Sequence, residues 1–140
     1  MFNFLNVSIW VILISGVVNM AGGMLWYGPL FGKAWMKGMG IDPDNKEQVA
    51  AMQKEAGPGY AFSLLFALIF GYALDLILNT LALSNVFLAI AVILVIYIGF
   101  SVGNTLKPVL WGETSKKVFL INTAFEVTYT VLLTVVAFYL

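Results

Sequence analysis

Long stretches without a charged side chain constrain the fold of this chain more than any other feature. Residues 1–32 and 76–106 carry no charge, and residues 118–140 hold a single acid, Glu126. Each stretch can form a helix of at least about 30 Å, the thickness of the hydrocarbon core of a bilayer. Only 10% of the residues are charged, against roughly 25% in a soluble domain. We therefore expect an all-α integral membrane protein.

The spacing of these stretches predicts four spans in a single membrane domain, residues 1–140. The uncharged run 76–106 is too long to complete one span, so we place a turn at Leu83-Ser84-Asn85, which holds residues that turn and cap readily. The N-terminus has no basic residue and no convincing cleavage site, so we expect the first span to be retained. The predicted spans form a four-helix bundle and cover residues 4–27, 59–82, 86–106 and 118–139.

The first connection, residues 28–58, is the one sizeable polar segment of the sequence. Its run Lys33–Lys37 combines lysines with Trp35, which favours a short helical turn in the membrane interface. Asp44 and Glu47 have the spacing of a capping box, so a second short helix is predicted from there to about Ala56. We expect an amphipathic connector that rests on the membrane and ends at Gly57-Pro58-Gly59.

The lysines set the predicted orientation. All seven lie in or beside the connections 28–58 and 107–117, and none lies at either terminus or in the turn at 83–85. Cytoplasmic loops carry the excess of lysine in membrane proteins. The bias therefore predicts that both connections are cytoplasmic and both termini are outside, and it argues against a dual topology.

Missing residue types exclude several classes of function. The chain has no Cys and no His, and its seven basic residues are all lysines. Transition-metal and haem sites therefore lack their usual ligands, and bidentate recognition of phosphate by Arg is absent. The formal net charge is zero, so no overall field favours nucleic acid. We expect no metal, no cofactor and no enzymatic activity.

Two runs carry a family resemblance. Leu25–Met36, with the sequence LWYGPLFGKAWM, and Lys117–Phe125, with the sequence KVFLINTAF, resemble the signature of the domain of unknown function (DUF) 1761 family. The resemblance covers essentially the whole chain. It implies a bacterial-type four-span protein of the cytoplasmic (inner) membrane with the same long first loop. The family is named for lacking a known activity, so no catalytic or binding residue carries over.

Glu126 is the most costly residue of the predicted spans. It lies about 13 Å into the fourth span, near the middle of the bilayer, where an acid costs roughly 2.5–3.5 kcal/mol. It should therefore face protein or water. Residues on the same helical face, and on the matching faces of the first and third spans, are expected to surround it. The predicted intramembrane cluster, for binding or for helix packing, is Asn19, Asn104, Asn122, Glu126 and Tyr129.

Two readings of these polar groups stay open. Glu126 either binds or relays a cation or proton, or it bonds to its neighbours and locks helices together. Asp75 lies nearer the outer turn and is a secondary acid with a stronger structural interpretation. The interfacial residues either anchor the helix ends or form an aromatic cage for an organic cation. These predicted anchors are Trp26, Tyr27, Lys33, Trp35 and Trp111.

The sequence supports two classes of function. The first is a non-enzymatic membrane subunit, surrounded by lipid, that forms a homo-oligomer or joins a larger membrane complex, because four short spans enclose little interior. The alternative is a small transporter or channel for a cation, a proton or a small organic solute that uses Glu126. A membrane enzyme is disfavoured, since Asp75 and Glu126 differ too much in depth to form a catalytic pair.

Overall fold

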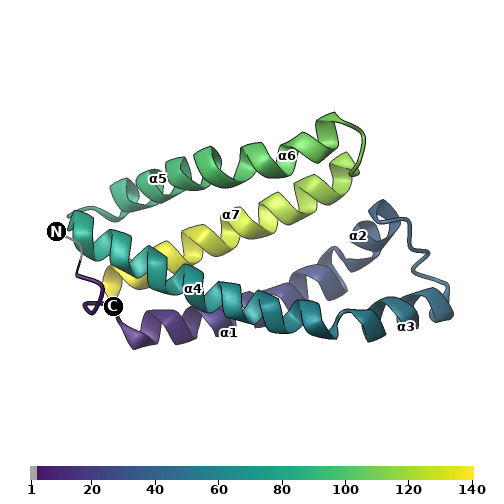
Figure 1. The fold of residues 1–140 in the computed structure, drawn as a ribbon, viewed down its shortest axis with the longest axis horizontal. Coiled ribbons are helices and arrows are strands. Elements are labelled where there is room, and N and C mark those ends of the chain that lie inside the picture. The colour runs from purple at the N-terminus through teal and green to yellow at the C-terminus, as the bar shows by residue number, and fades with distance from the viewer. Residues whose placement is uncertain (1–2) are drawn as a thin grey trace.

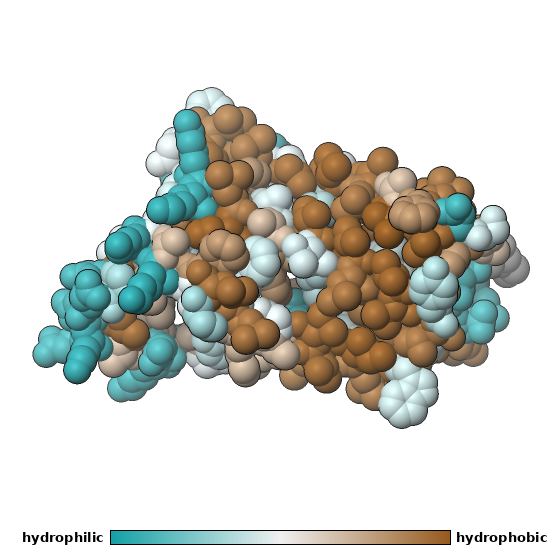
Figure 2. Space-filling model, turned by 180° about the vertical axis from the view of Figure 1, so that it is seen from behind, coloured by the Kyte–Doolittle hydropathy of each residue, from teal (hydrophilic) through white to brown (hydrophobic). Residues whose placement is uncertain are grey.

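A computed structural model describes residues 3–140, which form helices and turns only. As predicted, four helical segments are long and apolar enough to cross a membrane: Ile9–Leu30, Gly57–Leu81, Val86–Leu110 and Lys116–Tyr139. They run side by side, with both termini at one end and the connections 31–56 and 111–115 at the other (Figure 1). We call the end that holds the two connections the lysine end. Hydrophobic side chains cover most of the face seen in Figure 2, and hydrophilic ones gather at the lysine end.

Helix α1 (Ile9–Leu25) begins five residues later than the predicted residue 4. The backbone N–H of Ser8 donates to Asp75 Oδ2 at 2.7 Å, and the side chain of Asn79 donates to the carbonyl of Asn6 at 3.0 Å. These bonds hold residues 6–8 against the second span and outside the helix. The predicted start is wrong because Asp75 and Asn79, the residues that keep residues 6–8 out of the helix, lie about 70 residues away in the sequence.

The first span ends in a π-helical turn, η1 (Trp26–Leu30). Pro29 has no backbone N–H to donate, Gly28 takes non-helical angles (φ −106°, ψ −105°), and the N–H of Phe31 bonds five residues back to Trp26 O at 2.8 Å. A Cβ on Gly32 would lie 2.5 Å from Tyr27 O, so the close turn requires glycine there. The chain thereby changes direction into the short helix α2 (Gly32–Gly38).

The connector helix α3 (Lys46–Glu55) starts one residue later than the capping box predicts. Its N-cap is Asn45, whose Oδ1 accepts from the N–H groups of Glu47 and Gln48 at 3.1 and 3.2 Å. The predicted cap Asp44 is wrong, because its neighbour supplies the oxygen that reaches these donors. Helix α4 (Gly57–Leu81) follows directly, with Pro58 in its first turn, where no N–H is needed.

The turn between the second and third spans is where the sequence places it. Ala82 ends α4 in a left-handed conformation (φ 46°), and Asn85 caps α5 (Val86–Tyr97). The third span continues through a second π-helical turn, η2 (Ile98–Val102), into α6 (Gly103–Leu110). It therefore extends past the predicted end at residue 106. Pro108 removes one backbone donor, but it lies only two residues before the helix ends.

Helix α7 (Lys116–Tyr139) is the central element. It contacts α1 and α4 on one side and α5 and α6 on the other, whereas the third span packs chiefly on α7 and stands apart from α1 (Figure 1). The apolar core lies in the half nearer the termini, so the lysine half is held by other contacts. The core residues are Val11, Leu74, Leu78, Ala89, Ile93, Tyr129, Leu133 and Ala137.

Candidate functional site

Two segments far apart in the sequence meet at the lysine end. The indole N–H of Trp26 donates to Ile121 O at 3.0 Å, and the hydroxyl of Tyr27 donates to Asn122 Oδ1 at 2.8 Å. The ring of Phe125 lies 5.8 Å from that of Trp26 and 5.5 Å from that of Tyr27, measured between centroids. We call these five residues the motif junction. It joins the end of the first span to the first half of α7.

Helix α2 covers the start of α7 beside the motif junction. A Cβ added to Gly38 would lie 2.6 Å from Val118 Cγ2, so the absence of a side chain lets the two helices touch. The ring of Trp35 meets Tyr27 edge-on at 5.7 Å. Its Nε1 is buried and has no hydrogen-bond partner among residues 3–140. Trp35 therefore packs into the protein, whereas Lys33 on the same helix is exposed.

Glu126 lies one helical turn beyond Asn122 on α7. The hydroxyl of Tyr97 on α5 donates to Glu126 Oε2 at 2.6 Å. Tyr97 is buried and Glu126 is half-buried. This bond holds the third span to α7, and it leaves the other carboxyl oxygen of Glu126 without a hydrogen bond to the described residues.

Tyr129 belongs to a separate contact deeper in the bundle. Its hydroxyl donates to Ser15 O at 3.2 Å, and Ser15 Oγ donates to Ala67 O at 2.5 Å. Ser15 is fully buried, and Tyr129 is 8% exposed. The two hydroxyls therefore connect three spans, α1, α4 and α7. Because every partner lies inside the protein, this contact is structural.

The structure divides the predicted polar cluster into pairs. Asn122, Glu126 and Tyr129 each bond to a different element, and Asn19 is half-buried without a hydrogen bond from its side chain to residues 3–140. Asn104 lies elsewhere: it is exposed, donates to Phe100 O in its own helix at 2.9 Å and accepts from Lys107 Nζ at 3.3 Å. The prediction that Asn104 lies with Glu126 is therefore wrong.

Two tyrosines outside the predicted cluster bond to its members. Tyr97 takes the place expected for Asn104, and Tyr27, predicted as an interfacial anchor, turns its hydroxyl inward onto Asn122. A tyrosine within an apolar span signals such a role, because its buried hydroxyl needs a partner. Trp111, in contrast, is 81% exposed at the end of α6, as an anchor in lipid would be.

Asp75 lies away from the lysine end and is explained by packing. It is 3% exposed and accepts from the N–H of Ser8 at 2.7 Å and from Asn79 Nδ2 at 3.1 Å. A carboxylate at the first turn of α1 also stabilises the partial positive charge of that helix end. Asp75 thus ties the start of α1 to α4.

Comparison with known families decides what kind of protein this is. The chain matches the model of a family described as "Protein of unknown function (DUF1761)" over residues 10–138. It belongs to the DUF1761 family. No curated protein and no solved structure matches the chain. The two runs of this DUF1761 protein that resemble the family signature are the two sides of the motif junction, so the resemblance and the contact coincide.

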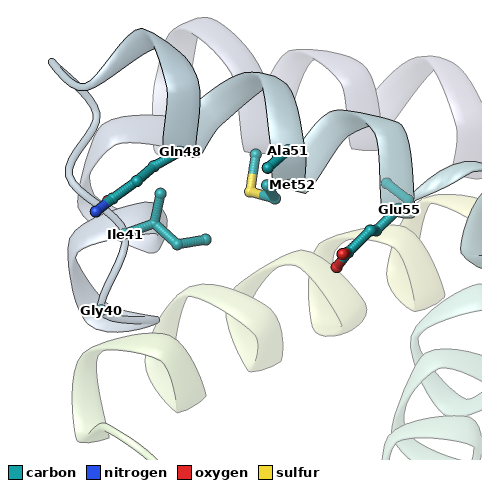
Figure 3. A pocket seen from close by; sticks show the side chains of 7 residues that line it. Gly40, Ile41, Gln48, Ala51, Met52 and Glu55 are labelled. Atoms are coloured by element: carbon teal, nitrogen blue, oxygen red, sulfur yellow. The ribbon is translucent and has the colours of Figure 1, made fainter.

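Two hollows in this DUF1761 protein are lined by residues other than Glu126. An open one of about 500 Å³ lies under α3, outside the spans (Figure 3). A second, of about 50 Å³, lies near the termini. Among residues 3–140, no three His, Cys, Asp or Glu side chains are grouped to hold a metal ion. The larger hollow is lined by Gly40, Ile41, Gln48, Ala51, Met52, Glu55 and Ala56.

Proposed function

We propose that this protein is a non-enzymatic membrane subunit that assembles with further copies of itself through its third span. The observation that carries the proposal is that this span packs chiefly on α7 and leaves Gly99 and Gly103 uncovered. A Cβ added to either glycine would meet no atom within 4 Å. Small residues on an uncovered helix face let membrane helices approach closely. The uncovered pair therefore offers a contact surface for another helix.

The same chain uses buried glycines where two of its own spans meet. A Cβ on Gly71 would lie 2.6 Å from Ser15 Cβ, and one on Gly16 would lie 2.9 Å from Leu68 Cδ2. Glycine weakens a helix by about 1 kcal/mol relative to alanine, and close packing offsets that cost at Gly16 and Gly71. At Gly99 and Gly103 no contact within residues 3–140 offsets it.

The lysines support a membrane orientation for this assembly. The protein lies in a bacterial-type inner membrane with the lysine end in the cytoplasm and both termini outside. The support is the position of the lysines, all of which lie from residue 33 to 54 or from 107 to 117, on the side where positively charged loops are retained.

Disulfide trapping tests the contact, because the natural chain has no cysteine. In lipid nanodiscs or native membranes, the Gly103→Cys variant should form a disulfide-linked dimer under mild oxidation. Gly23→Cys on α1 is the matched control, since an added Cβ there also meets no atom within 4 Å, and it should form no disulfide-linked dimer. Native mass spectrometry should show loss of the oligomer in Gly99→Leu/Gly103→Leu. A monomeric wild-type protein in nanodiscs and membranes would contradict the proposal.

Transport of a cation or proton is the second candidate, and the environment of Glu126 favours it. This half-buried carboxylate within a span has one hydrogen-bond partner, Tyr97, among the described residues. Charged groups inside membrane spans commonly mark ion or proton pathways. Proteoliposome flux should then fall in Glu126→Gln and persist in Asp75→Asn. Unchanged flux in both variants, together with altered oligomer stability in Glu126→Gln, would remove this candidate.

A further inference from the structure

Four lysines lie on α2 and on the first turn of α7, two helices that contact each other beside the motif junction. Lys33 and Lys37 lie one turn apart on α2, and Lys116 and Lys117 begin α7. The two helices are neighbours because Gly38, next to Lys37, packs onto α7 next to Lys117: its Cβ position is 2.6 Å from Val118 Cγ2 and 3.5 Å from Ser115 Oγ. We call these four lysines the lysine rim.

The lysine rim has no counterion within the described chain. All four side chains are exposed, and none forms an ion pair with an acid of residues 3–140. Lysines four residues apart on one helix repel each other, so Lys33 and Lys37 weaken α2 unless an anion lies between them. The acids of the connector, from Asp42 to Glu55, do not supply that anion.

Exposed apolar side chains lie within three residues of the lysine rim in the sequence. Leu30 and Phe31 precede α2 and are 62% and 39% exposed, and Leu120, three residues after Lys117, is 63% exposed. A ligand that fits both features is amphiphilic, with an anionic head and apolar chains. A soluble anion would use only the lysines.

We propose that the lysine rim binds the phosphate of an anionic phospholipid headgroup, with the acyl chains against Leu30, Phe31 and Leu120. The rim lies where the first span ends and the fourth span begins, which is the level of the headgroups in a bilayer. Clustered lysines beside membrane helices attract acidic lipids, each lysine strengthening binding about fivefold. The proposal does not depend on self-assembly or on which side of the membrane the rim faces.

Native mass spectrometry of the full chain, released from mixed phosphatidylglycerol and phosphatidylcholine nanodiscs, tests this inference. The wild type should retain phosphatidylglycerol in preference to phosphatidylcholine. Lys37→Gln/Lys117→Gln should lower that preference by roughly 25-fold at low salt, since two lysines are removed. Lys46→Gln/Lys54→Gln is the matched control, because it removes the same charge from exposed positions on α3. Its preference should stay within about twofold of the wild type.

Three results would overturn the proposal. The first is equal retention of the two lipids by the wild type. The second is an equal loss in the α3 control, which would mean that net charge alone acts. The third is displacement of the lipid by inorganic phosphate or glycerol phosphate at millimolar concentration, which would assign the lysines to a soluble anion. Circular dichroism should give the same helix content for all variants, because each altered lysine is exposed.

Discussion

The first and third spans contain the same small residue in opposite surroundings. Gly16 of α1 packs on the second span, where Gly71 in turn packs on α1, and in both cases an added Cβ would overlap another side chain. Gly99 and Gly103 of the third span face open space. A glycine in a membrane helix therefore indicates a contact surface only once its neighbours are known. In this chain one surface is filled internally, and the other is free.

The two acids within the spans differ in the same way. Asp75 is 3% exposed and accepts from two donors on different elements. Glu126 is half-buried and accepts from Tyr97 alone. An acid that is satisfied internally acts in packing, whereas one with a free oxygen remains available to a ligand, to water or to a partner. Asp75 is therefore explained by packing, whereas Glu126 keeps one oxygen that packing within the described chain does not use.

The largest expected effect is on the free energy of unfolding, when alanine replaces a glycine of the filled surface rather than one of the open surface. Gly71→Ala places a Cβ 2.6 Å from Ser15 Cβ and 3.2 Å from Ile12 Cα, so α1 and α4 must separate. We expect the free energy of unfolding to fall by about 1–3 kcal/mol. Gly99→Ala should leave monomer stability unchanged or slightly raised, since alanine favours helix. Reversible unfolding of both variants in detergent micelles measures the difference.

A fall in monomer stability for Gly99→Ala equal to that for Gly71→Ala would break the comparison. It would mean that the third span is covered by its own chain. Gly23→Ala is a suitable control, because Gly23 is also in a span and meets no atom within 4 Å. It should match Gly99→Ala in detergent.

An intermediate effect is expected from the two acids. Asp75→Ala removes the acceptor of the Ser8 N–H, and because this donor is only part-buried we expect a cost of about 1 kcal/mol, the low end for an unpaired donor. Glu126→Gln should cost less, because glutamine keeps an oxygen that accepts from Tyr97. Hydrogen exchange at the Ser8 amide should rise in Asp75→Ala and stay unchanged in Glu126→Gln. Unchanged exchange in Asp75→Ala would show that the cap is not formed.

Features that depend on local chemistry could be predicted from the sequence. The four spans follow from the uncharged stretches, and the turn at 83–85 follows from Asn85, which caps the next helix. The breaker role of Pro29 is also local, because a missing N–H acts within one turn. Such features need no knowledge of which helices are neighbours.

Features that depend on packing between spans could not be predicted. No residue near Ser8 indicates that Asp75 will bind its N–H and set the start of α1. No residue near Asn104 indicates that Asn104 lies away from Glu126. Which face of a helix is buried depends on the helices packed around it. In the third span, moreover, the regular α-helical repeat is interrupted by the π-helical turn η2. That turn lies between Tyr97 and Asn104, so it changes which of them faces α7.

The smallest expected effect concerns Tyr97 and Tyr27, the two tyrosines that bond to Glu126 and Asn122. Tyr97→Phe removes the bond to Glu126, and Tyr27→Phe removes the bond to Asn122. Hydrogen bonds between membrane helices contribute about 0.6 kcal/mol on average, so each change should lower the free energy of unfolding by about that amount. Tyr60→Phe is the control, because Tyr60 is 57% exposed and should show no change.

The double variants sharpen the comparison of the two pairs. Tyr27→Phe combined with Asn122→Ala should cost less than the sum of the single changes, because the two residues share one bond. Tyr27→Phe combined with Tyr97→Phe should be additive, because their partners Asn122 and Glu126 have no hydrogen bond to each other among the described contacts. Strong coupling between the tyrosines would instead join the motif junction and Glu126 into one network, and a ligand at Glu126 would then act on the family motif itself.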